Sequence, residues 1–247
     1  MKTTNPKQKN YRIQIFSLLF LFSIEVVAQS GVNVYADLGT NNVSHGLFIK
    51  SAVLGNYKFG KNRLETGIQT DLKNYNKHIF SGYKLDASRD FMIKGILTEI
   101  HGFYTTTISS GIIRESNIGG MFRMRFTHFE MTLGTNLRTF SLSQSGIIVY
   151  ENQKNTSKMH EAGNFMYSFG YNLKPAENSW NAGITLTNFD HFMINQETNP
   201  MVNLHGSYRM KSPVSLYAQA WYKIAGASNL EVNYFGFYLK TGLLWNF

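Results

Sequence analysis

The chain has 247 residues, enough for one domain or at most two, and its 24 Lys and Arg against 15 Asp and Glu give a formal charge of +9. It contains no cysteine, which excludes a disulfide framework, a thiolate nucleophile, a Cys-ligated metal and the acyl anchor of a lipoprotein. A mean hydropathy of −0.22, and the lack of any apolar run of ~18–20 residues, exclude a helical membrane protein.

The first 28 residues have the pattern of a secretory signal peptide. The opening stretch "MKTTNPKQKNYR" is basic, "IQIFSLLFLFSI" follows as a short apolar core, and Val26-Val27-Ala28 ends the segment with small or modest residues. The alternative, a membrane anchor, needs a longer core than this one, which Glu25 follows at once. We therefore expect residues 1–28 to be cleaved during export and residues 29–247 to form the mature domain.

After this leader, apolar and polar residues alternate with a period of two, which is the pattern of half-buried strands. Abundant Gly, Phe and Tyr with only 4 Pro suits long strands with tight bends. In chain order the predicted strands are 32–39, 45–58, 62–74, 80–91, 96–107, 114–126, 129–142, 162–174, 180–190, 201–210, 214–224 and 233–247. No linker or low-complexity tract interrupts them, so we predict a single domain.

The connections differ in length at the two ends of the predicted strands. Very short turns occur at 60–62, 127–128 and 211–213, whereas the long loops 143–160 and 190–200 lie at the opposite end. Outer-membrane barrels have this asymmetry, with short periplasmic turns and long exterior loops. An even strand count returns both termini to the periplasmic side. We predict twelve strands and leave ten or fourteen open, because the boundary around "MIKG" is the least well marked.

The final strand shows most clearly that each strand has one apolar and one polar face. One face consists of Phe235, Phe237, Leu239, Leu243, Trp245 and Phe247, and the other of Tyr234, Gly236, Tyr238, Lys240, Gly242 and Asn246. A soluble, lipocalin-like barrel would turn the apolar face inward. We predict the opposite, because these bulky residues would overfill a barrel core and the polar faces suit a wet lumen. Tyr, Trp and Phe at the ends of the apolar face suit an aromatic girdle.

The end of the chain carries a further signal. Phe247, with Trp245 and Leu243 alternating behind it, resembles the C-terminal signal of Gram-negative outer-membrane β-barrel proteins. The resemblance implies a location in the bacterial outer membrane, contact with its lipid, and a last strand that the barrel-assembly machinery reads. The predicted fold is an all-β, single antiparallel up-and-down transmembrane β-barrel whose last strand pairs with the first, because unpaired backbone groups are costly in hydrocarbon. Twelve strands predict a narrow lumen that side chains or a folded-in loop partly occlude.

The fifth to seventh predicted strands hold the densest polar cluster of the chain. Its members are Glu99, His101, Glu115, Asn117, Arg123, Arg125, Glu130 and Arg138. If a turn lies at 127–128, Arg125 faces Glu130 across the strands. The cluster is either a ladder of ion pairs that stiffens the barrel or a constriction whose charges select solutes. Further cations fall on the predicted inner face and favour anionic solutes: Lys50, Lys58, Lys84, Arg209, Lys223 and Lys240.

One pattern is similar to the catalytic residues of outer-membrane phospholipases. His205 and Ser207 form a His-x-Ser pair, and a turn at 211–213 places His205 opposite Gln219. However, that family uses Asn as the orienting residue and needs its site on the lipid-facing surface, whereas alternation with Leu204 places this pair in the lumen. The remaining histidines show no metal-ligand spacing. We predict no catalytic site, no metal, no cofactor and no nucleic-acid partner.

Two functions remain nearly equal on the sequence. The first is a narrow channel or transporter for small polar or anionic solutes, and the second is a non-conducting barrel that captures a partner through the exterior loops 143–160 and 190–200. An outer-membrane hydrolase is a remote third. Rings of one charge sign in the lumen favour the channel, and continuous ion pairs favour the non-conducting barrel. The sequence identifies neither the solute nor a protein partner.

Overall fold

The computed structural model describes most of the predicted mature domain. The described residues are 29–41, 47–73, 80–109, 113–142, 160–175, 179–194, 196–211, 213–223 and 235–247. The predicted signal peptide 1–28 lies outside them, as does the loop 143–160 except for its last residue. None of the described residues forms a helix long and apolar enough to cross a bilayer.

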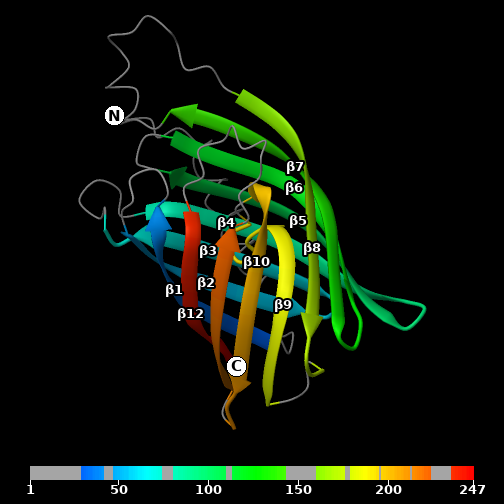
Figure 1. Ribbon diagram of the computed structural model, residues 1–247. Helices are drawn as coiled ribbons and strands as arrows, with labels where there is room; N and C mark the ends of the chain where they lie inside the picture. The colour runs from blue at the N-terminus through cyan, green and yellow to red at the C-terminus, as the bar shows by residue number, and fades with distance from the viewer. Residues whose placement is uncertain are drawn as a thin grey trace, which may run out of the picture.

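The described residues form a closed antiparallel barrel of twelve strands, in which each strand pairs with its neighbours in the sequence (Figure 1). The strands are β1 Gln29–Asn41, β2 Leu47–Phe59, β3 Asn62–Asp71, β4 Phe80–Ile93, β5 Ile96–Ser109, β6 Ile113–Arg125, β7 Phe129–Leu142, β8 His160–Asn172, β9 Trp180–Phe189, β10 Gln196–Arg209, β11 Val214–Lys223 and β12 Phe235–Asn246. This confirms the predicted up-and-down topology and strand count.

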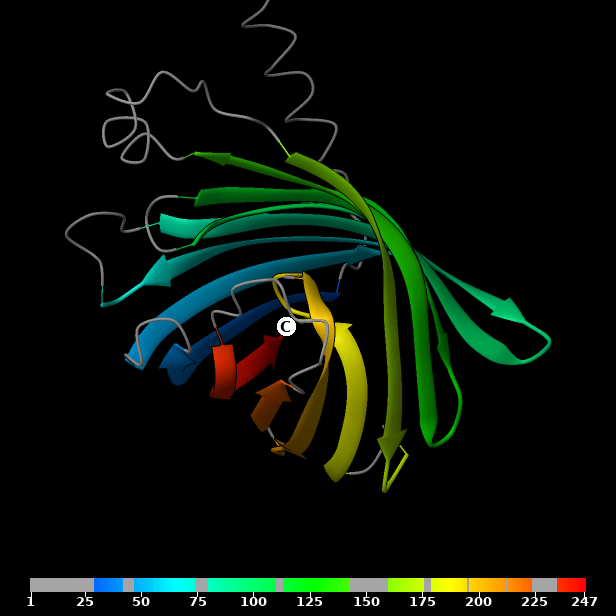
Figure 2. The same ribbon diagram turned by 45° about the horizontal axis from the view of Figure 1, so that its top comes forward.

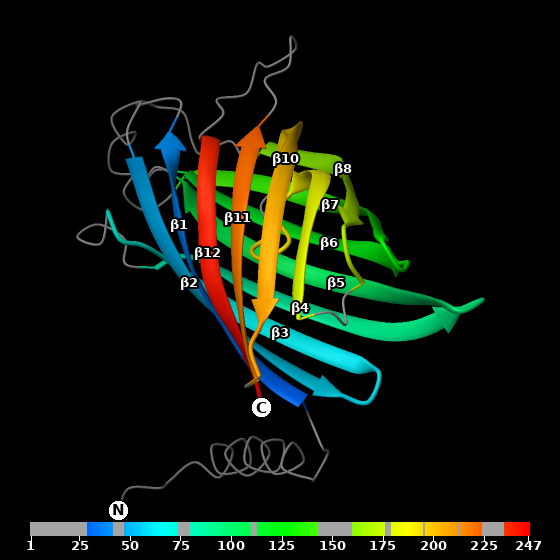
Figure 3. The same ribbon diagram turned by 60° about the horizontal axis from the view of Figure 1, so that its bottom comes forward.

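The barrel closes where β12 pairs with β1 (Figure 3). In this seam Val34 is opposite Leu243 and Asp37 is opposite Lys240. The backbone N–H of Phe247 donates to the carbonyl of Ser30 over 2.9 Å, and the Ser30 N–H donates back over 3.2 Å. The seam thus satisfies backbone groups that would be unpaired in an open sheet.

Tight turns at one end of the barrel fix the strand register. The β4–β5 connection, which was the least certain boundary, is a two-residue hairpin turn. Its residues Lys94 and Gly95 have φ values of 49° and 83°. Two positive φ values are typical of the turn that matches the twist of paired strands. β4 therefore continues to Ile93 and β5 starts at Ile96, as the register Ile93 opposite Ile96 shows.

The orientation of the two faces is as predicted, with apolar side chains outside and polar side chains inside. The outward residues Ile118 and Leu204 are 57% and 56% exposed, whereas the inward Asn117 and Thr132 are fully buried. Exposed aromatic residues cluster around the end with the short turns: Tyr57, Phe59, Phe129, Tyr171, Trp180, Tyr208 and Trp245. An apolar exterior with an aromatic girdle matches the bilayer core and its interface.

One connection differs from the prediction. Residues 190–200 were expected to form an exterior loop, but Asp190–Ile194, here called the strap, turn from the end of β9 into the barrel (Figure 2). Phe189, Met193 and Ile194 are at most 1% exposed. β10 already begins at Gln196 and shows a register shift before Met201. The apolar side chains of this connection are buried in the lumen, which explains why it does not project outward.

Candidate functional site

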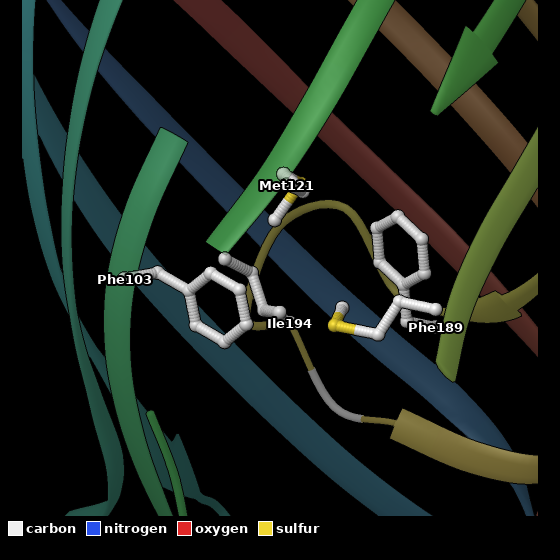
Figure 4. Close-up of a cluster of buried hydrophobic side chains, with 5 residues drawn as sticks. Phe103, Met121, Phe189 and Ile194 are labelled. Atoms are coloured by element: carbon white, nitrogen blue, oxygen red, sulfur yellow. The ribbon is translucent and has the colours of Figure 1, made fainter. Parts of the chain in front are cut away.

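The strap lies inside the barrel and divides its interior. On one side it packs into an apolar cluster formed by Phe103, Met121, Met166, Phe189 and Ile194 (Figure 4). Met193 packs into a second cluster with the inward residues Tyr35, Ala52 and Leu54. Ile194 has a φ of 53°, a left-handed conformation that is rare and strained for a β-branched residue. The surrounding contacts therefore hold the strap in a conformation that the free backbone disfavours.

His191 anchors the strap to the charged wall of the lumen. The Nη2 of Arg123 lies 3.2 Å from Nδ1 of the imidazole, and Nε2 lies 2.9 Å from Oγ of Ser168. A guanidinium can only donate, so Nδ1 accepts and Nε2 carries the proton that is donated to Ser168. The ammonium of Lys84 also donates to the His191 carbonyl over 3.4 Å. These contacts suit a neutral imidazole.

Asp190 and Phe192 anchor the strap to the opposite wall, formed by β1, β11 and β12. The ammonium of Lys240 donates to Oδ2 of Asp190 over 2.7 Å. The ring of Phe192 stacks on Tyr217 with 5.4 Å between centroids and 12° between planes. It also meets Tyr35 in a tilted arrangement at 5.2 Å. The strap thus binds both walls through side chains of five consecutive residues.

A glycine shapes this second wall. Gly242 lies between Tyr35 on β1 and Tyr217 on β11 in the strand register. A Cβ at this position would lie 2.5 Å from the Tyr217 hydroxyl. Because Gly242 has no side chain, Tyr217 can cross β12 and donate to Oδ1 of Asn33 over 2.7 Å. The tyrosine ring is therefore held flat against the wall beneath Phe192.

The predicted cluster on β5 to β7 forms two separate groups of charges. The first is centred on Glu99, which is 2% exposed. Its carboxylate lies 3.3 Å from Arg123, 3.1 Å from Arg125 and 3.6 Å from Arg63. His101 lies between the carboxylates of Glu99 and Asp86, at 3.3 Å and 3.1 Å. Arg125 also pairs with Glu130, as the turn position predicted.

The second group is centred on Glu115. Arg138 donates to both carboxylate oxygens of Glu115, over 2.8 Å and 3.0 Å, and Asn117 donates to the same carboxylate over 2.9 Å. Asn117 and Arg138 are opposite each other in the β6–β7 register, whereas Arg123 is opposite Thr132. The two arginines therefore lie at different heights on one inner face, as predicted.

A cavity of about 330 Å³ extends between the strap and the short-turn end of the barrel. His191 and Phe192 of the strap line one end, and Lys58 and Asn246 line the other. Arg63, Lys84 and Arg123 also contribute to its wall, together with Glu65 and Asp86. Lys84 pairs with Glu65 over 2.6 Å, so the wall alternates between donors and acceptors. Such a lining suits water and small polar solutes.

Sequence reasoning found the inner-face charges and allowed for a loop folded into the lumen, but it did not identify the strap as that loop. All seven predicted constriction residues have neighbours in the two charge groups: Glu99, His101, Glu115, Arg123, Arg125, Glu130 and Arg138. His191, Phe192 and Asp190 were placed in an exterior loop. The apolar run "FMI" within that loop was the available signal, because exterior loops are usually polar. Phe247, Trp245 and Leu243 project outward, and their role as an assembly signal stays a prediction.

The His-x-Ser pair does not form a lipid-facing catalytic site. His205 is opposite Gln219, as predicted, and belongs to the inner face because Leu204 points outward. Its Nε2 donates to Oδ1 of Asn172 over 3.0 Å. Within the described residues no group of three or more His, Asp or Glu side chains is arranged to hold a metal ion.

The sequence matches no family model and no curated protein significantly. Solved structures do resemble this barrel. The COG4313 outer membrane channel from Pseudomonas putida F1 superposes with a TM-score of 0.57 and 9% identity, over 90% of this chain and 97% of that one. The KdgM porin gives a TM-score of 0.52 with 10% identity, over 88% and 99%. The same porin in complex with disordered oligogalacturonate gives 0.51 with 11% identity. The chain therefore has the fold of outer-membrane β-barrel proteins.

Proposed function

We propose that the chain is an outer-membrane channel for small polar solutes, with a preference for anions, and that the strap is its gate. The strap is the observation that carries the proposal. It lies across a polar lumen, and ion pairs and ring contacts hold it to the walls. A loop that only filled the lumen would be more stable with a relaxed backbone, whereas the backbone of the strap is strained at Ile194. A strained element held by side chains suits two alternative positions.

The charges of the lumen support the anion preference. In the structure Asp190 brings a carboxylate to Lys240, which is fully buried. If the strap swings outward, this carboxylate leaves while Lys240, Lys84 and Arg123 stay on the strands. The open lumen is then more positive than the closed one, and a positive path favours anions. The KdgM porin, solved in complex with oligogalacturonate, shows that a barrel of this fold can accept a polar oligosaccharide.

Conductance across planar lipid bilayers tests the channel. We expect the purified barrel to show discrete openings, and a reversal potential in a KCl gradient that reports anion preference. Replacing Arg123 with alanine removes one anchor of the strap and one lumenal cation, so openings should become more frequent and less anion-selective. Arg138→Ala should lower anion selectivity without changing the opening frequency, because Arg138 pairs with Glu115, in the second charge group. A barrel that inserts but never conducts, even with Asp190→Asn and Phe192→Ala combined, would refute the proposal.

A second candidate is a non-conducting barrel that acts through exterior loops. It is favoured by the pairing of interior charges, since Lys84, Arg123, Arg138 and Lys240 all contact carboxylates. Because Asp190–Ile194 fold inward, loop 143–160 is the segment on which this function depends. Deletion of 145–157 should then abolish partner capture by whole cells without lowering the amount of inserted barrel. Unchanged capture would exclude this candidate.

A further inference from the structure

The wall that receives the strap has the composition of a ligand site. Tyr35 and Tyr217 present two rings on either side of Gly242, and Lys240 projects from β12 next to them. The Lys240 ammonium lies 4.1 Å from the centroid of Tyr35 and is completely buried. Asp37 is its lateral neighbour at 3.7 Å. The site therefore combines an aromatic platform with the Lys240 ammonium, which contacts Asp37 and one further carboxylate, and Lys50 is opposite Asp37 on β2.

Two side chains of the strap fill this site in the manner of a bound molecule. The carboxylate of Asp190 takes the short contact to Lys240, at 2.7 Å. The ring of Phe192 lies flat on Tyr217, and the Lys240 ammonium is 4.4 Å from its centroid. Carboxylate and ring are thus presented together, on the same ammonium and against the same pair of tyrosines. The strap contributes both groups, and the barrel wall binds the ring and Oδ2 of the carboxylate, whereas Oδ1 of Asp190 accepts from the Phe192 N–H of the strap itself over 2.8 Å.

We propose that Asp190 and Phe192 occupy a binding site for a solute that carries a carboxylate beside a flat, apolar ring face, and that this solute displaces the strap. The proposal rests on the proposed channel and specifies its solute class and its opening. Two sources share this chemistry: aromatic carboxylates, whose ring stacks on tyrosine, and sugar acids, whose C–H face does the same. In both, the carboxylate replaces Asp190 on Lys240.

The solute can replace the strap because Lys240 needs a close carboxylate both when the strap is docked and when it is displaced. An ammonium buried in this lumen without a short ion pair would be strongly unfavourable. A strap that left without replacement would leave Lys240 with Asp37 alone, at the longer distance. A ligand with both groups restores the lost contacts and releases the strain at Ile194. The strap then competes with the ligand, so the apparent affinity of the native barrel equals the intrinsic affinity multiplied by the fraction of barrels whose strap is displaced.

Calorimetric titration of the detergent-solubilised barrel tests the site. The probes are benzoate and D-glucuronate, with acetate as the carboxylate without a ring. In the double variant Asp190→Asn, Phe192→Ala both strap groups are gone, so at least one ring-bearing probe should bind about 10-fold or more tightly than to the native barrel, and acetate, which supplies the carboxylate alone, should gain clearly less. A gain in affinity for benzoate alone identifies the solute class as aromatic acids, and a gain for D-glucuronate alone identifies it as sugar acids. No gain for either ring probe would overturn the proposal.

Matched variants separate the site from general effects of charge. In the double variant, Lys240→Met should weaken the binding of the ring probe about 10-fold or more, the usual effect of losing a charged hydrogen bond. Lys58→Met removes an equal charge near the short-turn end, where Lys58 pairs with Asp90, and should leave binding unchanged. Equal losses in the two variants would overturn the proposal.

A single variant keeps the test decisive if the double variant does not fold. Phe192→Ala vacates the ring position but leaves Asp190 on Lys240. It should therefore bind neutral benzyl alcohol more tightly than the native barrel does, with no gain for benzoate. A gain for benzoate without a gain for benzyl alcohol would contradict the proposed site. Titration is independent of conductance. A barrel that conducts but shows no such binding refutes the site alone, and a barrel that binds but never conducts refutes the channel alone.

Discussion

Three arginine side chains converge on the carboxylate of Glu99. Its buried carboxylate faces Arg63, Arg123 and Arg125 within 3.6 Å and contacts His101 as well. The pairing of Arg125 with Glu130 was predictable from the turn between their strands. The reach of Arg63 was not, because β3 and β5 are separated by β4, and only the curvature of a closed barrel brings side chains from both into contact. Alternation identifies the inner face of each strand but not the contacts that cross the lumen.

We expect Glu99→Gln to destabilise the barrel by about 3 kcal/mol, because removing the buried carboxylate leaves the largely buried Arg123 and the partly exposed Arg63 and Arg125 with less counter-charge. Glu115→Gln is the matched control. The side chain of Glu115 is 11% exposed, against 2% for Glu99, and pairs with Arg138, so its loss should be clearly smaller. Equilibrium unfolding in guanidinium chloride, in detergent micelles, measures both. Equal losses of unfolding free energy in the two variants would show that the convergence of cations on Glu99 adds no stability beyond that of an ordinary ion pair.

At the scale of elements, the strands were predictable, and so was partial occlusion of the lumen, but not which loop folds inward. The twelve strands follow from period-two alternation and turn residues, which are local properties of the sequence. The strap forms because Phe103, Met121 and Met166, on three different strands, leave an apolar hollow that Phe189 and Ile194 fill. That hollow exists only after the barrel closes. The strap has only five residues, both charged and apolar, so its sequence shows no periodic pattern from which its inward fold could be predicted.

If the strap is the gate, we predict that its release depends on pH through His191, which lies in the connection between β9 and β10, outside the membrane-spanning strands. Burial, and the adjacent Arg123 guanidinium, lower the pKa of His191 to about 3. Lys84 also faces the imidazole and opposes its protonation, whereas Glu130 and Asp190 favour it. A released imidazole has a pKa of about 6.5. The docked strap is therefore fully favoured above pH ~6.5 and loses about 1.4 kcal/mol for each pH unit below it, until the pH reaches about 3.

Native channels should accordingly open more often as the pH falls from 7.5 to 4.5 in planar bilayers. His191→Asn keeps a polar side chain but does not titrate, so its opening frequency should be nearly independent of pH in this range. His128, which contacts the Asn172 carbonyl beside a short turn, supplies the control: His128→Asn should retain the native pH profile. Acid activation that persists in His191→Asn would mean that another group controls the strap.

For the whole molecule, the other conclusions depend on which face of each strand points outward and which points into the lumen. The sequence alone favoured an apolar exterior because bulky residues on twelve strands would overfill a closed barrel. The structure confirms this, since the outward faces of β6 and β10 are exposed and apolar while the lumen is lined by buried polar groups. Many polar groups are tolerated inside because they find partners on neighbouring strands, as the Asn136 amide does when it donates to Oδ1 of Asn117 over 2.7 Å.

An apolar exterior that faces lipid should make the cost of a surface charge depend on depth. Ile118 lies near the middle of β6 and is 57% exposed, and Phe129 starts β7 at a short turn and is 59% exposed. We expect Ile118→Arg to destabilise the barrel in phospholipid vesicles by about 2–4 kcal/mol, and Phe129→Arg by about 0–1 kcal/mol beyond the loss of its ring. Guanidinium unfolding in vesicles measures the two costs. Because the two side chains are almost equally exposed, a barrel surrounded by water would show no such difference, and equal costs would contradict a membrane-spanning barrel.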